Sequence, residues 1–385
     1  GISSADNDTN TSFFPNPFAY GSVSGTLPYD NGGSAILATF TLAKWSGPEL
    51  ESTAPFSGAT TSDVTSMAYS MVQRGSLRYD SYAHLQNVYN YDEYTIGKQY
   101  YYTGASIIPK MKQSILDHGA MSVSLFFDKT FLHPSANGHA YYQTYYSGAQ
   151  AVKNANHSVT IVGWDDNFSA SNFSRTPAGN GAWLIANSYG TASGDNGYFW
   201  LSYYDQSICD CSSFLVESAG NYDHIYQTDL CGWVGQLGYG KESAFFANIY
   251  TAEEKEELEA VGFYATGENT SYQVYTVTDA EGSSQFGRRR KVASGEVANA
   301  GYYTVLLDKT VTLEAGERFA VIVEITTPGA IHPVAIEYSS PDKGLTVDLS
   351  DGEGYISYRG SSWERVETEQ NCNVCLKAYT RNVDS

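Results

Sequence analysis

The hydrophobic pattern of the N-terminal part changes from irregular to helical close to residue 33. Residues 1–32 are rich in Asn, Ser, Gly and Pro and follow neither a helical nor a strand period, so we expect an extended surface loop. Ile36, Phe40 and Ala43 then recur at helical spacing, and a Gly-Pro pair follows them. This pattern predicts a helix over residues 33–45 that packs in a core.

A second helical pattern is followed directly by a strand pattern. Ile108, Met111 and Ile115 fall on one helical face, and Gly119 is a suitable cap for the end of that helix. The apolar run over residues 120–127 predicts a strand immediately after it.

Two polar residues stand at the ends of two further apolar strands. His157 comes just before the run at 159–162, and the run at 183–185 leads to Asn187. A residue at the end of one strand can approach a residue at the end of its neighbour. We therefore expect the imidazole and the amide to meet across one sheet.

The pattern changes again after residue 216. Short alternating strands, such as 272–277, 302–307 and 319–325, are separated by Gly, Asp, Asn and Pro turns. This spacing is typical of an all-β sandwich. The sequence thus predicts an α+β region followed by an all-β sandwich.

Composition limits the classes of function. The 385 residues are 42% hydrophobic and 17% charged, which fits a globular protein of two domains. Forty-two acidic against 22 basic residues give a net charge of −20, which argues against nucleic acid and anionic membranes as partners. The sequence contains no run of 18 apolar residues, so it predicts no membrane-spanning helix. The 32 tyrosines exceed all Lys and Arg together, a balance common in exported bacterial proteins.

The stretches NHSVTIVGWDD and GAWLIANSYGTASGDNGYFWLSYYD resemble the His and Asn motifs of the papain-like cysteine peptidases. Two earlier blocks, beginning NGGSAIL and IIPKMKQ, resemble other segments of that family in the same order, so the resemblance spans about 31–205. It implies an α+β papain-like fold and a Cys-His-Asn triad. In that triad His157 is the general base and Asn187 orients its ring. Trp164 and Tyr189 are expected as near neighbours, with Tyr189 in place of the family's Trp.

The nucleophile of the family has no counterpart in this chain. All cysteines lie after both motif residues, whereas the family places the catalytic Cys upstream on a buried helix: Cys209, Cys211, Cys231, Cys372 and Cys375. The resemblance implies that a separate N-terminal segment or light chain supplies the catalytic Cys and the central helix. Without that helix, we expect the apolar face of the 33–45 helix to be exposed.

The C-terminal part resembles the lectin-like domain that is appended to bacterial papain-like peptidases. The blocks NYDHIYQTDL, GEGYISYRGSSW and NVCLKAYT carry this resemblance. We expect an incomplete papain-like domain over 1–218 and a lectin-like β-sandwich over 219–385. Tyr358 and Trp363 are interpreted as ordinary sandwich residues and not as a carbohydrate platform.

Other chemistry has weaker support. The pair at Cys372 and Cys375 is a single CxxC without a second pair or a histidine cluster, so we expect neither metal nor cofactor. Asn156 begins an N-glycosylation sequon next to His157, where a glycan would obstruct the site. The sequons are interpreted as chance matches in a bacterial protein.

The sequence therefore predicts the larger, C-terminal chain of a secreted or cell-surface bacterial thiol endopeptidase. Its partners would be the Cys-bearing segment, a protein or peptide substrate and a cell-surface or glycan ligand. The alternative is a non-catalytic pseudopeptidase or surface binding protein that uses the β-sandwich to hold a cell-wall or glycan ligand. A Ser, Gly or Ala at the upstream Cys position would favour that alternative.

Overall fold

A computed structural model describes residues 3–6, 34–48, 50, 81–91, 107–340 and 346–383. The chain divides into two compact units. The site unit comprises residues 33–36 and 88–215, and the β-rich unit comprises residues 1–32, 37–87 and 216–385. The predicted domain boundary at 218/219 stays a prediction, and the compact units group residues 37–87 with the C-terminal part.

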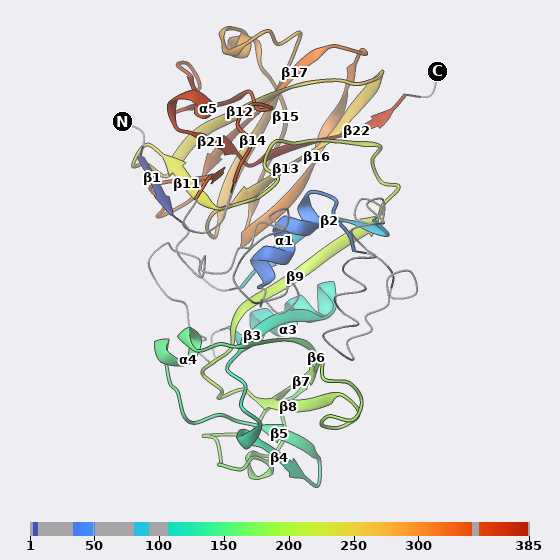
Figure 1. Ribbon diagram of the computed structural model, residues 1–385, viewed down its shortest axis with the longest axis vertical. Coiled ribbons are helices and arrows are strands. Elements are labelled where there is room, and N and C mark those ends of the chain that lie inside the picture. Colours follow the sequence, from blue (N-terminus) through green and yellow to red (C-terminus); the bar gives the residue numbers. More distant parts are fainter. Residues whose placement is uncertain are drawn as a thin grey trace. The chain divides into compact units, whose positions relative to one another are not determined.

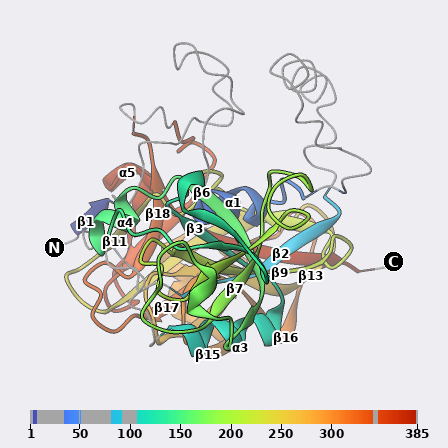
Figure 2. The ribbon, with the colours of Figure 1, turned by 90° about the horizontal axis from the view of Figure 1, so that it is seen from below.

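The site unit is built on seven strands in the order β9-β3-β6-β7-β8-β5-β4. Neighbouring strands are antiparallel, except that β5 runs parallel to β8. The ribbon in Figure 2 shows β3, β6 and β7 running together. The strands are β3 (Met121–Leu125), β4 (Leu132–Ser135), β5 (Gly138–Tyr141), β6 (His157–Asp165), β7 (Ala182–Ala186), β8 (Tyr198–Ser202) and β9 (Cys209–Ser218).

Helix α3 (Ile108–His118) packs against β3 and β6 (Figure 1). A proline stands in its first turn, where the missing N–H is tolerated, and Gly119 ends it with a φ of 88° that favours glycine. Met111 is fully buried in the core of the unit, and Ile108 and Ile115 pack against that core. The predicted helix and the strand that follows it are confirmed. Short helices over Lys129–Phe131 (η5), Ala149–Lys153 (α4) and Ala170–Asn172 (η6) complete the unit.

The β-rich unit contains three groups of strands. Six strands follow the order β15-β14-β17-β12-β19-β20, four follow β10-β22-β13-β16, and four follow β1-β11-β18-β21. Their bounds are β1 (Ser3–Asp6), β10 (His224–Tyr226), β11 (Gly235–Gly238), β12 (Ser243–Thr251), β13 (Glu256–Ala265), β14 (Thr270–Thr278), β15 (Arg290–Val297), β16 (Ala300–Leu313), β17 (Arg318–Thr326), β18 (Val334–Tyr338), β19 (Gly354–Ser357), β20 (Glu364–Arg365), β21 (Cys372–Val374) and β22 (Leu376–Asn382). Short helices η7 (Ser283–Arg288) and α5 (Val366–Glu369) connect them, and β2 (Ala83–Asn90) crosses the unit boundary along the chain.

Aromatic side chains join the six-stranded group of the β-rich unit to the group β10-β22-β13-β16. Phe263 of β13 lies 5.3 Å from Tyr272 of β14, and Tyr226 of β10 lies 5.4 Å from Phe319 of β17, both between ring centroids. Such contacts between strands of different groups are those expected of two packed sheets. The predicted strands at 272–277, 302–307 and 319–325 lie within β14, β16 and β17, so the predicted all-β architecture is confirmed.

Helix α1 (Ala35–Ala43) corrects one expectation about the N-terminal part. Phe40 and Ala43 are 5% and 1% exposed, and the Phe40 ring lies 5.9 Å from that of Tyr264. The β-rich unit itself therefore packs against the buried face of this helix, and the glycine at 232 leaves room for the Phe40 ring, since a Cβ there would lie 2.5 Å from it. The expectation of an exposed apolar face is wrong for these residues.

The predicted N-terminal loop is also corrected over four residues. Ser3–Asp6 forms β1, which pairs antiparallel with β11. The sequence SSAD carries no apolar alternation, so only the backbone pairing with β11 selects the strand. The rest of the 1–32 prediction lies outside the described residues. Among the helices in the described ranges, none combines the length and apolarity needed to cross a bilayer.

Candidate active site

His157 is the first residue of β6, and the residue before it fixes where that strand begins. The backbone N–H of Asn156 donates to the carbonyl of Leu125 at 3.0 Å. The Asn156 side chain accepts from the backbone N–H of Phe127 at 2.7 Å and donates to its carbonyl at 3.2 Å. These bonds satisfy the backbone just beyond β3 and hold the entry into β6. A glycan on this amide would disrupt the arrangement.

Asn187 directly follows β7, and its backbone and side chain are both held. Its N–H donates to the carbonyl of Gly197 at 2.9 Å. Its Oδ1 accepts from the N–H of Ser188 at 2.8 Å and lies 2.8 Å from Nε2 of His157. Because a backbone N–H identifies Oδ1 as an acceptor, Nε2 of His157 must donate to it. In the neutral ring, Nδ1 then carries the lone pair.

Two aromatic rings enclose the imidazole of His157. Tyr189 stacks on it with ring centroids 4.8 Å apart and an interplanar angle of 22°. Phe127 lies 5.2 Å away at 48° and also contacts Tyr189 at 5.9 Å. Apolar rings beside a hydrogen bond exclude water from it and strengthen it. The expected position of Tyr189 next to the imidazole is confirmed.

The sequence did not single out Phe127 as a neighbour of the imidazole. Its position at the end of an apolar run predicted burial, and it is 9% exposed. Contact with His157 depends on the register of β3 and β6, in which Leu125 pairs with His157. The sequence signal that could have indicated this contact was the pair of Phe126 and Phe127 at the end of the apolar run.

Trp164 is not a near neighbour of the imidazole, and that expectation is wrong. It lies seven positions along β6 from His157, which corresponds to roughly 20 Å of strand. There it pairs with Trp183, and Nζ of Lys112 lies 5.6 Å from its ring centroid. Sequence proximity to the His motif suggested the contact, but an extended strand carries the indole away.

The cysteines of the site unit lie on β9, two strands from β6. Cys209 pairs with Ser124, which in turn pairs with Ser158. Paired residues project from the same face of a sheet, and successive residues alternate, so Cys209 and His157 are directed to opposite faces. Cys211 is 1% exposed within the core of the unit.

The cysteines of the β-rich unit are poor nucleophiles for a different reason. Burial, together with the carboxyl of Glu337, raises the pKa of the Cys231 thiol to about 12. Burial likewise raises the pKa of Cys372 to about 12 and that of Cys375 well above its usual value. Thiols of this kind do not form thiolates at neutral pH. Cys231, Cys372 and Cys375 are free thiols.

The other candidates from the sequence, the CxxC pair and the two aromatic residues, lie in the β-rich unit. Within the described ranges, no group of three or more His, Cys, Asp and Glu side chains could hold a metal ion. Trp363 packs against Phe286 with ring centroids 4.9 Å apart. Tyr358 is 39% exposed and lies 5.7 Å from Tyr239.

Comparison with known families agrees with this architecture. Residues 31–219 match the model of the papain family cysteine protease, and residues 225–380 match that of the lectin like domain. These matches identify the chain as a papain-like cysteine peptidase with a C-terminal lectin-like domain. No curated protein sequence matches it at a significant level.

Two solved structures are similar to this chain in fold. One contains the cysteine protease and lectin-like domains of Cwp84, a surface layer associated protein of Clostridium difficile. It is similar with a TM-score of 0.70 at 24% identity, covering 92% of this chain and 74% of that chain. The other is a Cys-to-Ala variant of clostridial Cwp84 after propeptide cleavage, with a TM-score of 0.70 at 23% identity over 92% and 83% of the two chains. At such identities the likeness shows the fold alone.

Proposed function

We propose that this chain is the larger, C-terminal part of a bacterial thiol endopeptidase whose catalytic Cys lies on a separate N-terminal segment. The observation that carries the proposal is the 2.8 Å contact between Nε2 of His157 and Oδ1 of Asn187 inside the region that matches the papain family. It leaves Nδ1 as the nitrogen that takes the thiol proton. The resulting thiolate and imidazolium would form an ion pair.

The reaction follows from these two roles. The thiolate adds to the carbonyl carbon of the peptide bond, and the imidazolium gives its proton to the leaving amine. Water then adds to the acyl-enzyme, with His157 taking its proton, and the thiol is restored. Asn187 contributes by keeping Nε2 protonated, which holds the ring in the tautomer that the first step needs.

The location of the protein and the role of the β-rich unit belong to the same proposal. One solved relative by fold is a surface layer associated protein, and the net charge of −20 favours solubility. We place this peptidase outside the cell or at its surface. The β-rich unit would select the protein or glycan surface on which the peptidase acts.

The experiment joins the chain to the segment encoded directly upstream of it. We expect peptide hydrolysis that iodoacetamide abolishes, and two components on a denaturing gel of the active preparation. The 42.0 kDa chain alone should be inactive. Full thiol-dependent activity of that single species would contradict the proposal. An upstream segment with Ser, Gly or Ala at the Cys position, together with no hydrolysis, would favour the pseudopeptidase.

A further inference from the structure

A turn connects the two strands that flank Asn187, and its backbone is tightly closed. The N–H of Gly197 donates to the carbonyl of Ser193 at 2.8 Å, and the N–H of Asp195 donates to that of Tyr198 at 2.8 Å. The N–H of Asn187 donates to Gly197 at the base. We call residues 187–198 the Asn187 turn. Because the turn carries Tyr189 as well as Asn187, its placement sets two of the neighbours of the imidazole.

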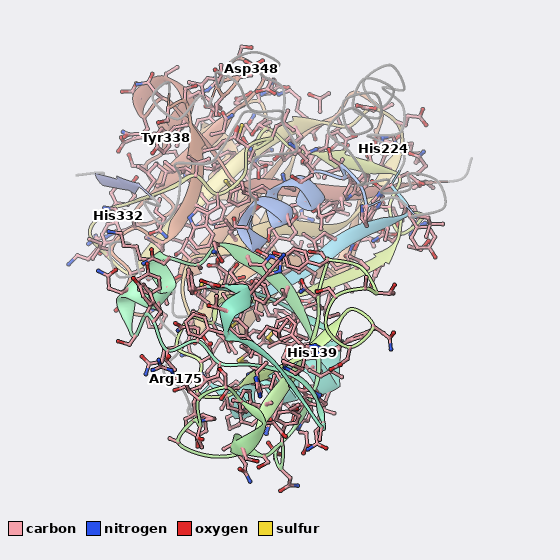
Figure 3. The ribbon with its side chains drawn as sticks, turned by 60° about the horizontal axis from the view of Figure 1, so that its bottom comes forward. His139, Arg175, His224, His332, Tyr338 and Asp348 are labelled. Carbon is pink, nitrogen blue, oxygen red and sulfur yellow. The ribbon has the colours of Figure 1, made fainter. Side chains whose placement is uncertain are left out.

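One side chain of this turn is fixed from a different strand. The carboxylate of Asp195 accepts the backbone N–H of His139 at 2.5 Å through Oδ2. Its Oδ1 lies 2.8 Å from Nδ1 of the same residue, so Nδ1 donates. His139, labelled in Figure 3, is the second residue of β5, the strand that runs parallel to β8. Two bonds from one residue make this a directional contact.

The glycine before His139 allows the close approach of the carboxylate. Gly138 has a φ of 106°, and a Cβ on it would lie 2.5 Å from Oδ2 of Asp195 and 3.3 Å from the Trp200 ring. Both the conformation and the space therefore require glycine here. The contact between His139 and Asp195 thus depends on a glycine in a conformation that other residues rarely adopt. An incidental ion pair on the surface would not require such a backbone conformation.

We infer that His139 and Asp195 form a positioning pair that holds Asn187 and Tyr189 against the imidazole of His157. The inference rests on the proposed peptidase function for its kinetic consequence. Neither residue touches the substrate. The pair acts through the turn, since Asp195 is held to β5 while Asn187 and Gly197 close the base of the turn.

The kinetic test uses the chain assembled with its Cys-bearing segment. His139→Ala should lower kcat by about 10- to 100-fold with little change in KM, because misalignment at the reacting groups affects the chemical step. His139→Asn should recover most of kcat, since its amide nitrogen can take the place of Nδ1. The matched control is His133→Ala on the adjacent strand β4, where the side chain is exposed, and it should keep wild-type kcat.

A second measurement does not depend on turnover. In histidine-labelled protein, the Nε2–H proton of His157 should exchange slowly with water while it donates to Asn187. His139→Ala should accelerate this exchange, and His133→Ala should not. Wild-type kcat and unchanged exchange in a folded His139→Ala variant would overturn the inference, even if its melting temperature fell. An inactive wild-type assembly would instead count against the proposed function, and the exchange measurement would still decide on the pair.

Discussion

Two of the histidine–asparagine contacts in the described residues join Nε2 to an asparagine Oδ1, one in each unit. A third contact, in the β-rich unit, uses Nδ1 of His84 and Oδ1 of Asn221. Nε2 of His157 lies 2.8 Å from Oδ1 of Asn187 in the site unit. Nε2 of His224 lies 2.8 Å from Oδ1 of Asn382 in the β-rich unit. The pair distance alone therefore cannot identify a catalytic group. The surroundings of the second ring nitrogen separate the two.

His224, labelled in Figure 3, has an acceptor on both sides of its ring. Its Nδ1 lies 3.6 Å from a carboxylate oxygen of Glu253, and its Nε2 lies 4.0 Å from Glu256. These groups link β10 to its neighbour β22, which carries Asn382, and to Glu256 at the start of β13. Among the ion pairs of the described ranges, none involves His157, and aromatic rings lie beside it instead. Nδ1 of His224 lies near the Glu253 carboxylate, whereas Nδ1 of His157 is the nitrogen that the proposed reaction needs as its proton acceptor.

The largest difference between the pairs should appear in hydrolysis. His157→Ala in the assembled enzyme should lower kcat/KM by about a thousandfold or more, since the thiolate loses its base and ion-pair partner. His224→Ala is the matched control and should remain within about threefold of wild type, because it touches no part of the proposed triad. Steady-state cleavage of a small peptide by both folded variants measures this. Equal losses would remove the functional distinction between the pairs.

Replacing the two asparagines should also affect kcat unequally, but the difference should be smaller than that between the two histidine variants. Asn187→Ala should lower kcat by about 10- to 100-fold, because the ring keeps its proton-accepting nitrogen but loses its fixed orientation. Asn382→Ala should leave kcat unchanged. The same peptide assay applies, with circular dichroism as the check on folding. A loss for Asn187→Ala as large as that for His157→Ala would mean that the amide does more than orient the ring.

Glu256, which lies 4.0 Å from Nε2 of His224, should make the stability of the β-rich unit depend on pH. Burial acts to raise its pKa, but hydrogen bonds from Thr380, Tyr226 and the backbone outweigh burial, so the pKa is lowered from its usual 4.5. The ionised group therefore stabilises the fold above pH 4.5, and this stability is lost as pH falls through the lower folded pKa. Glu256→Gln should cost about 1–3 kcal/mol at pH 7.

The difference between Glu256→Gln and wild type should shrink below pH 4.5. Urea unfolding at pH 7 and pH 3.5 tests this, with the exposed Glu254→Gln as the control. A difference that stayed constant with pH would show that Glu256 contributes only through packing.

The smallest expected effect on hydrolysis comes from the tyrosine ring that lies beside each histidine. Tyr189 stacks on His157 at 4.8 Å, whereas Tyr226 lies 6.3 Å from His224. Tyr189→Ala should reduce kcat/KM about tenfold, because water then reaches the bond between His157 and Asn187. Tyr204, which is 40% exposed, provides the control as Tyr204→Ala. Unchanged kcat/KM for Tyr189→Ala would mean that Phe127 alone shields the bond.

The sequence by itself determined the helix and strands around the site and the two residues that meet in it, His157 and Asn187. The periods of 3.6 and 2 defined α3, β3, β6 and β7, because apolar spacing fixes which face is buried. The placement of His157 and Asn187 at strand ends was sufficient to predict their contact. The family motifs indicated the role of each residue, and that role stays a prediction.

Tertiary structure decided the features that depend on register and on chain segments far apart. The register of β3 against β6 brought Phe127 to the imidazole, and the extension of β6 removed Trp164 from it. The packing of α1 on Tyr264 and the contact between His139 and Asp195 join residues separated by 56 positions or more. No local period encodes such contacts, since they form only when the strands have paired and the side chains compete for the same space.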